Sequence, residues 1–422
     1  MKQHKFFMVV ILLSSALFAS AQDSLNVQRL GQLSSGDGFA WKVAVAGDYA
    51  YVANENNLKI IDISDPYAPS ETGSLGLSAA YSVAVSGSYA YVGCWYHLRV
   101  IDISNPAVPL EVGSCSIFGG PVRGLAVDGD YAYAGGLGLR VIDITNPAAP
   151  SEVGFCPTPN EIRGVAVSGN FAYVAAMTSG LRVIDITDPA APFEVGYYDT
   201  PGSAYGVAVA GNYAYVADYT SGLRVVDITN PAAPLEVAFY GMQGARNVAV
   251  AGKYAYIADP LYGLHVLDVS DPTVPIEVGY YDTPGSPEGV ATDCELVYLA
   301  DYYYLGIYEF EPCTEVIPLA PQVVVQPEGQ SARLTWDPVD ETTCGCTVDV
   351  THYLVFYSPT SEGEYYYHGF TTDTTYVHTG VIQYAEGMYY HVFATTAEVP
   401  ALRELPTGGV MTQDEVLARL KK

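Results

Sequence analysis

The sequence predicts an all-β protein, in which a seven-bladed β-propeller closed by its own N-terminal strand is followed by a β-sandwich. One segment, typified by VAVSGNFAYVAAMTSGLRVIDITDPAAPFEVG, recurs at steps of 40 to 42 residues. A period of that size marks stacked units that cannot bury their apolar faces alone. The copies begin at Val43, Val83, Leu125, Val165, Val207, Val248 and Val290.

Each copy contains four strand signals. Runs rich in Val, Ile and Tyr (VAV, AYVA, LRVIDI and EVGYYDT) are separated by clusters of Gly, Asn, Asp and Pro, which favour tight turns. An Asn-Pro or Asp-Pro pair follows the third run, and proline cannot donate a ladder hydrogen bond, so it marks the end of that strand. Four strands per repeat of this length are typical of propeller blades.

The end of the last copy predicts how the ring closes. The seventh copy stops after YEFEP without an EVG-type fourth strand. Upstream of the first copy, LNVQRLGQLSS places Leu30-Gly31 in line with the Val-Gly of the later copies. The N-terminal segment therefore supplies the outer strand of the last blade and ties the two ends of the propeller together.

The element that reads LKIIDIS, LRVIDIS, LRVIDIT, LRVVDIT and LHVLDVS resembles the LVIVD repeat of bacterial and archaeal cell-surface proteins. The resemblance covers about two-thirds of the chain. It implies a secreted or surface-displayed propeller, and it transfers no catalytic residue.

The first residues read as an export signal. A basic start is followed by a mostly apolar run and by Ala19-Ser20-Ala21, which fits a signal-peptidase site before Gln22. We therefore expect a protein that is secreted or displayed at the cell surface, with the periplasm as an alternative, and with no membrane span after signal removal. The formal net charge of −28 disfavours nucleic acid and anionic membranes as partners.

A different pattern begins after the punctuating linker Pro318 to Pro321. The strands that follow resemble a fibronectin type III domain, with Trp336 at the place of the family's core tryptophan and Tyr390 at the place of the tyrosine in its penultimate strand. The last residues contain a capping box, Thr412-Gln-Asp-Glu415, so a short helix is expected there. The predicted divisions are 1–21 signal peptide, 22–313 propeller, 314–397 sandwich and 398–422 tail.

Cysteines and acidic residues give no metal or cofactor prediction. Cys294 and Cys313 both fall at one edge of the seventh blade, so a disulfide between them is reasonable. No calcium loop of the DxDxDG type and no zinc ligand set is present. The chain also lacks the GxSxG, HExxH and P-loop motifs. The aspartates of the VIDI element recur in six of the copies (Asp62, Asp102, Asp143, Asp185, Asp227 and Asp268), which indicates a packing role, bonding to nearby turn amides.

A functional site should break the sevenfold rule, and one position does so. The turns on one side of the disc hardly vary, whereas the loops on the other side diverge. Two residues ahead of each VAV element the residue type changes from blade to blade, and the inner strands of a propeller line its channel. We therefore expect these residues to ring the channel mouth: Trp41, Tyr81, Arg123, Arg163, Tyr205, Arg246 and Glu288.

Arginine and aromatic residues are enriched at binding hot spots, so this ring is a candidate ligand site for a surface protein or a glycan. The competing interpretation is that unconstrained loops drift and that tyrosine is abundant in this chain. The sequence favours an exported, non-catalytic binding, adhesion or scaffold protein. The alternative is an extracellular polysaccharide hydrolase or lyase that uses Glu288 with Asp218, Asp259 or Asp301, although nothing selects a pair.

Overall fold

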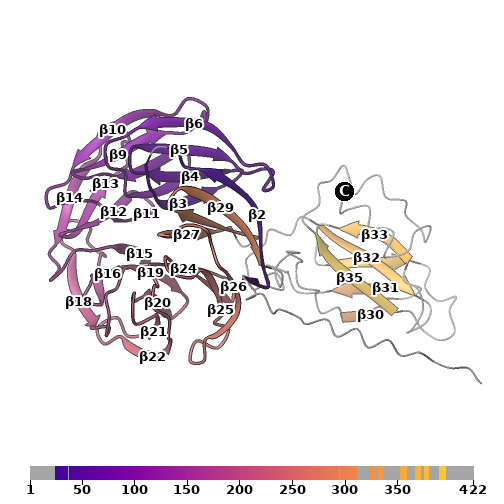
Figure 1. Ribbon diagram of the computed structural model, residues 1–422. Helices are drawn as coiled ribbons and strands as arrows, with labels where there is room; N and C mark the ends of the chain where they lie inside the picture. Colours follow the sequence, from indigo (N-terminus) through magenta and orange to yellow (C-terminus); the bar gives the residue numbers. More distant parts are fainter. Residues whose placement is uncertain are drawn as a thin grey trace, which may run out of the picture.

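The computed structural model describes residues 24–36, 38–293, 295–310, 324–328, 331–335, 352–358, 366–371, 375–379 and 389–395. Residues 24–310 form seven antiparallel sheets that follow one another around a ring (Figure 1). Each sheet is one blade, as the repeat predicts, and its strands succeed one another from the axis to the circumference.

The first four blades follow the chain without a crossover. Blade 1 contains β3 (Ala40–Ala46), β4 (Tyr49–Asn54), β5 (Asn57–Asp62) and β6 (Ser70–Gly76). Blade 2 contains β7 (Ser82–Ser86), β8 (Tyr89–Gly93), β9 (His97–Asp102) and β10 (Leu110–Ser116). Blade 3 contains β11 (Gly124–Asp128), β12 (Tyr131–Gly136), β13 (Gly138–Asp143) and β14 (Ser151–Cys156). Blade 4 contains β15 (Gly164–Ser168), β16 (Phe171–Ala175), β17 (Leu181–Asp185) and β18 (Phe193–Tyr198).

Blades 5 and 6 repeat the pattern, and blade 7 borrows its last strand. Blade 5 contains β19 (Gly206–Ala210), β20 (Tyr213–Ala217), β21 (Leu223–Asp227) and β22 (Leu235–Tyr240). Blade 6 contains β23 (Asn247–Ala251), β24 (Tyr254–Asp259), β25 (Gly263–Asp268) and β26 (Ile276–Tyr281). Blade 7 contains β27 (Gly289–Thr292), β28 (Leu296–Asp301), β29 (Tyr304–Phe310) and β2 (Val27–Ser34).

The predicted closure by the N-terminal strand is confirmed. Strand β2 pairs antiparallel with β29 and completes blade 7; in Figure 1 the indigo β2 lies beside the orange-brown β29. The register shifts between Arg29 and Gly31, as it shifts between Glu111 and Gly113 in blade 2. The Leu30-Gly31 alignment is therefore correct to the residue. Strand β1 (Ser24–Leu25) adds a fifth strand to blade 6 by pairing with β26, which the sequence pattern did not indicate.

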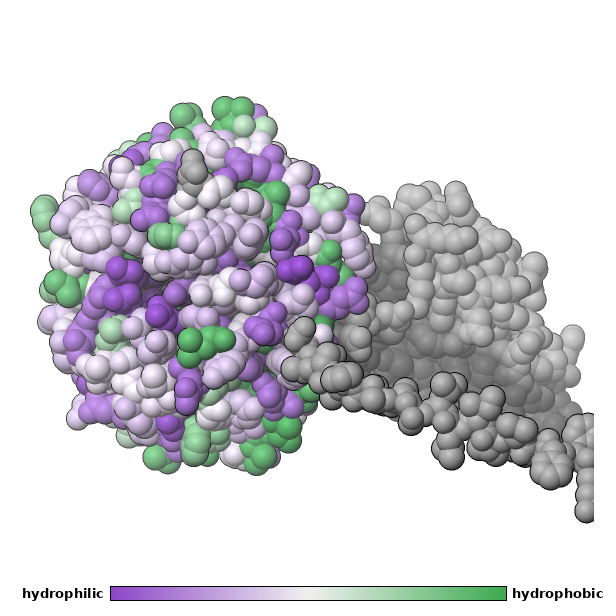
Figure 2. All heavy atoms as spheres, in the orientation of Figure 1, coloured by the Kyte–Doolittle hydropathy of each residue, from purple (hydrophilic) through white to green (hydrophobic). Residues whose placement is uncertain are grey.

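The core lies between the blades. Seven clusters of buried apolar residues are present, and each joins two neighbouring sheets. Between blades 2 and 3, for example, Leu98 and Val100 pack with Ala132 and Ile142. Both faces of every sheet are thus covered, which explains the near-continuous apolar runs in the second and third strands. Figure 2 shows green hydrophobic residues at the circumference of the propeller, where fourth strands begin with exposed residues such as Leu110 and Leu235.

Two three-stranded sheets are described after residue 323. The first has the order β30 (Val324–Glu328), β31 (Ser331–Thr335), β34 (Thr375–Thr379). The second has the order β33 (Tyr366–Thr371), β32 (His352–Ser358), β35 (Tyr389–Thr395). Leu334 and Val355, one in each sheet, are fully buried. Trp336, the predicted tail helix, and residues 1–23 lie outside the described residues. The described residues include no helix that is long and apolar enough to cross a membrane.

Candidate functional site

A pit lies where the inner strands meet at the variable face. Its volume is about 400 Å³, part of it open to solvent, and all seven residues expected at the channel mouth line it together with Lys42. In six blades the backbone explains this convergence. The N–H of the ring residue donates to a carbonyl at the end of the second strand of its own blade; the Tyr81–Gly93 bond, for example, is 2.8 Å. In these six blades the repeat thus presents Tyr, Arg or Glu side chains from one fixed position.

Blade 1 reaches the pit by a different route. The register of β3 against β4 shifts between Ala40 and Lys42, which leaves Trp41 as the extra residue of a β-bulge. Bulges re-aim side chains and are common next to functional sites. Here the shift accompanies two consecutive side chains, Trp41 and Lys42, both of which line the pit.

In the other blades, the position equivalent to Lys42 is occupied by small residues. The equivalent residues of the other blades are Ser82, Gly124, Gly164, Gly206, Asn247 and Gly289. A Cβ at Gly206 would lie 2.9 Å from Cα of Asn247, and a Cβ at Gly289 would lie 2.9 Å from Cα of Lys42. Because neighbouring backbones approach so closely, a long side chain at this level has room only in the channel. Lys42 accordingly lines both the pit and a second cavity of about 460 Å³ among the inner strands.

The guanidinium groups of the pit are held by two acids. Glu161 bridges Arg123 and Arg163, since its Oε1 lies 3.0 Å from Arg123 Nε and its Oε2 lies 3.0 Å from Arg163 Nη2. Glu288 Oε2 accepts a hydrogen bond of 2.9 Å from Arg246 Nη1. All of these side chains are partly buried, so the pairs are screened less than surface pairs. The acids fix the arginines in place around the axis.

Tyrosine rings pack against the same arginines. The Arg123 guanidinium lies 4.6 Å from the centre of the Tyr81 ring, and that of Arg246 lies 4.7 Å from Tyr205 and 5.1 Å from Tyr219. Cation–π contacts of this kind are worth about 0.5–2 kcal/mol, depending on desolvation. They limit the freedom of the arginines, which lowers the entropic cost of binding a ligand there.

Blades 7, 1 and 2 contribute a continuous aromatic cluster. The ring centres of Trp41 and Tyr81 are 6.1 Å apart, and those of Tyr81 and Trp95 are 5.9 Å apart. Phe39 stacks on Tyr302 at 4.2 Å. Trp95 is 42% exposed, so the cluster offers flat apolar surface to solvent. Among the described residues, the indole N–H of Trp41 is a buried donor without a hydrogen-bond partner.

Burial and neighbouring charge perturb two groups of the pit. Burial lowers the pKa of Lys42 to about 8; Arg246 and Arg163 act in the same direction, whereas Glu288 opposes them. Burial also raises the pKa of Glu288, against the effect of Arg246 and Lys42. Perturbed groups that share a concave site mark a functional candidate.

Ion pairs outside the pit follow the repeat instead. In six blades a basic residue on the third strand pairs with a glutamate twelve residues later on the fourth; the Lys59–Glu71 distance, for example, is 2.7 Å. The other pairs are Arg99–Glu111, Arg140–Glu152, Arg182–Glu194, Arg224–Glu236 and His265–Glu277. A contact that recurs in blade after blade serves the architecture, so these basic residues differ in role from those of the pit.

The VIDI aspartates are structural, as predicted. In each of six blades, Oδ1 accepts a hydrogen bond of 2.8–3.0 Å from the backbone N–H two residues on, as with Asp62 and Ser64. They shape the turn that carries the proline. They do not line the pit.

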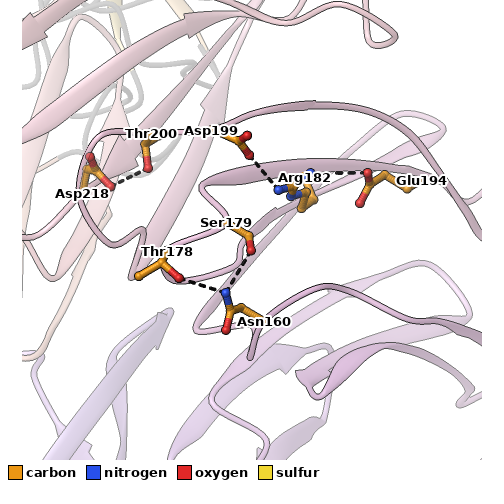
Figure 3. A network of polar contacts seen from close by, with 8 residues as sticks. All are labelled: Asn160, Thr178, Ser179, Arg182, Glu194, Asp199, Thr200 and Asp218. Atoms are coloured by element: carbon orange, nitrogen blue, oxygen red, sulfur yellow. Dashed lines mark hydrogen bonds and ion pairs between the residues drawn. The ribbon is translucent and has the colours of Figure 1, made fainter.

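The three loop aspartates named as candidate acids also have structural partners. Asp218 accepts hydrogen bonds from Thr200 Oγ1 at 2.6 Å and from the N–H of Gly202 at 2.8 Å; Figure 3 shows Thr200 directed at this carboxylate. Asp259 accepts from the N–H of Leu261 at 2.8 Å. Burial raises the pKa of Asp301 to about 6, against the hydrogen bonds that it accepts. All three are buried and none lines the pit.

Two residues of the site had a signal in the sequence that the prediction did not use. Lys42 stands in a column of Ser, Gly and Asn, one residue closer to the inner strand than the predicted ring. Glu161 is the only charged residue in the column four positions ahead of the VAV elements. Both would have been found by applying the rule of broken repetition to every column instead of one.

Cysteines and metals add nothing to the site. Cys94, Cys115 and Cys156 are free and buried. Cys294 and Cys313, the predicted disulfide, lie outside the described residues. In the part of the chain that the structure describes, no group of three or more His, Cys, Asp or Glu residues could hold a metal ion.

Comparison with known proteins agrees with this architecture. LVIVD repeats match residues 37–76, 79–117, 119–158, 161–200, 201–241 and 244–283, which is more than half of the chain. The chain therefore belongs to the LVIVD repeat family. The matches correspond to blades 1 to 6, and blade 7 is the divergent copy that β2 completes. No curated protein matches the chain.

Solved structures with a similar fold include a computationally designed protein, Ika8, at 11% identity and a TM-score of 0.51, covering 87% of this chain and all of that one. The WD40 domain of Neurospora crassa Pan2 is 11% identical with a TM-score of 0.55, over 67% of this chain and 95% of that one. The β-propeller domain of Cps50 (Swd1) from Myceliophteria thermophila is 13% identical with a TM-score of 0.55, over 67% and 99%. At these identities the likeness shows the fold alone.

Proposed function

We propose that this chain is an exported, non-catalytic binding protein that takes a protein or glycan ligand in the pit on the variable face of its propeller. The observation that carries the proposal is the departure from sevenfold repetition. One fixed backbone position presents three arginines, two tyrosines and a glutamate, a β-bulge adds Trp41, and these side chains converge on a single cavity.

The donor set supports binding rather than glycoside hydrolysis. Hydrolysis uses two carboxylates that flank the scissile bond. Glu288 is the only acid among the described residues that line the pit, and it is bonded to Arg246. Glu161, the second acid of the site, is paired with both Arg123 and Arg163. The loop aspartates that could have supplied a partner are engaged with backbone and threonine donors.

The rest of the chain fits an exported binding protein. The basic and apolar N-terminal segment, which ends in Ala19-Ser20-Ala21, acts as a cleavable signal peptide, so the mature chain begins at Gln22. The sheets β30-β31-β34 and β33-β32-β35, in which Leu334 and Val355 are buried, suit a fibronectin type III-like sandwich that serves as a spacer or docking unit. N-terminal sequencing of the exported protein tests the cleavage site.

A binding screen of the full mature chain against glycans and surface proteins tests the proposal. The variant Arg123→Gln, Arg163→Gln, Arg246→Gln should lose any hit by more than tenfold. The matched control, Arg99→Gln, Arg140→Gln, Arg224→Gln, removes three arginines of the repeated outer ion pairs and should retain it. Thermal melting of both variants verifies folding. Full retention by the pit variant would contradict binding at the axis.

A further inference from the structure

The pit carries an excess of positive charge in a strongly acidic protein. Four cations meet there, namely Lys42, Arg123, Arg163 and Arg246. Two acids are paired with the arginines, namely Glu161 and Glu288. The whole chain has a formal charge of −28, so a cationic centre is the exception on this molecule. An excess of two positive charges in a partly buried site favours an anionic ligand.

Lys42 is the cation without a partner. Among the described residues no ion pair to Lys42 is formed, because Glu161 is shared by two arginines and Glu288 is bonded to Arg246. A side chain that points into the channel, at a level where six other blades have Ser, Gly or Asn, is not required by the repeat. The depressed pKa of Lys42, about 8, shows that burial and its charged neighbours oppose its ammonium form. A carboxylate would supply the missing counter-charge.

The aromatic cluster defines the other half of the ligand. Trp41 and Tyr81 line the pit on the side of blades 1 and 2, next to Lys42. Both side chains line the pit, and the parts of their rings that are left free by Arg123 suit the C–H face of a pyranose ring. An acidic peptide would satisfy the charge but would leave this planar surface unused.

The shape of the pit favours the end of a chain over its middle. Side chains from all seven blades enclose the axis, and below the pit the channel continues between the inner strands. A ligand therefore enters along the axis. We propose that the pit binds the carboxylate-bearing terminal residue of an acidic glycan, with Lys42 and the neighbouring arginines holding the carboxylate and Trp41 and Tyr81 packing on the sugar ring. This inference rests on the proposed binding function and names the class of ligand.

Calorimetry on the full mature chain tests the inference with a matched pair of ligands. The methyl glycoside of glucuronic acid should bind at least tenfold more tightly than the methyl glycoside of glucuronamide, which has the same shape without the charge. Lys42→Met should remove that preference. The control Lys59→Met removes a lysine paired with Glu71 on the outer strands and should leave it intact.

Proton linkage supplies an independent readout. Because the pKa of free Lys42 is about 8, carboxylate binding at pH 8 should raise it and take up protons. The binding enthalpy should then vary with the ionisation enthalpy of the buffer in the wild type but not in Lys42→Met. A merely structural lysine would not produce this difference.

Each alternative outcome is distinguishable. Equal affinity for acid and amide would overturn the acidic-glycan inference while leaving a glycan site in the pit. Binding of neither sugar would overturn the inference, and the screen of glycans and surface proteins would still decide the proposed function. An oligoglutamate peptide could also bind more tightly than glucuronic acid and lose that binding in Lys42→Met. This result would mean that the positive charge of the pit binds an acidic protein, and it would also overturn the inference.

Discussion

At the scale of single residues, the ammonium of Lys42 is held at a cost to folding. Its pKa falls from 10.5 to about 8 mainly because burial disfavours the charged form. For a lysine with a depressed folded-state pKa, the contribution to stability is present above the unfolded pKa and is lost as the pH falls through about 8. At neutral pH the charged lysine therefore destabilises the fold, which is the pattern expected of a residue retained for function.

Removing this ammonium should stabilise the protein at neutral pH. We expect Lys42→Met to raise the free energy of unfolding at pH 7 by about 1–2 kcal/mol, a value reduced from the full pKa shift because Lys42 is partly exposed. The gain should shrink as the pH rises from 7 to 9.5. Urea denaturation at both pH values measures it. Lys59→Met is the control, because its partner Glu71 lies 2.7 Å away and no stabilisation is expected. A loss of stability in Lys42→Met at pH 7 would contradict the assignment.

At the scale of elements, the loops that frame the pit are clamped by buried aspartates packed against glycines. The connection between β22 and β23 contains Gly244, two residues before Arg246. A Cβ on Gly244 would overlap the carboxylate of Asp259. Asp259 is fully buried and accepts a hydrogen bond from the N–H of Leu261. The contact between Gly244 and Asp259 therefore fixes both the conformation of this loop and the backbone position of Arg246.

A methyl group at this contact should disturb both. We expect Gly244→Ala to lower the free energy of unfolding by about 1–3 kcal/mol, because the buried Asp259 carboxylate must move. It should also weaken ligand binding, since Arg246 is displaced. Gly241→Ala, three residues earlier in the same connection, meets no atom within 4 Å and should change little. Chemical denaturation and binding of both variants give the comparison, and equal effects would rule out the clamp.

At the scale of the whole molecule, the features that the sequence predicts are those that follow from its repeats. Aligned copies place Arg123 and Glu288 at the same backbone position, so the ring at the channel mouth was predictable without coordinates. The bridging of Arg123 and Arg163 by Glu161 was not, because it depends on how side chains from two blades meet in space. The fifth strand of blade 6 was not predictable either, since β1 has only two residues and therefore no period.

The charge of the whole molecule opposes that of its pit, which affects how an acidic ligand arrives. At an ionic strength of 0.01 M the Debye length is about 30 Å. An approaching anion is therefore repelled by the net charge of −28. At 0.15 M the Debye length is about 8 Å, and the long-range repulsion is screened. Pairs formed inside the partly buried pit are screened much less. Salt should therefore affect the approach of the ligand more than its retention.

The association rate of a glucuronate-terminated oligosaccharide should accordingly increase as the salt concentration rises from 10 to 150 mM, while its dissociation rate changes less. This is opposite to the usual electrostatic steering of a ligand toward an oppositely charged protein. Stopped-flow fluorescence of the aromatic cluster can follow both rates. The same oligosaccharide with a glucuronamide terminus is the control and should associate at a rate independent of salt. An association rate that falls with salt would mean that the four pit cations dominate the field far beyond the channel mouth.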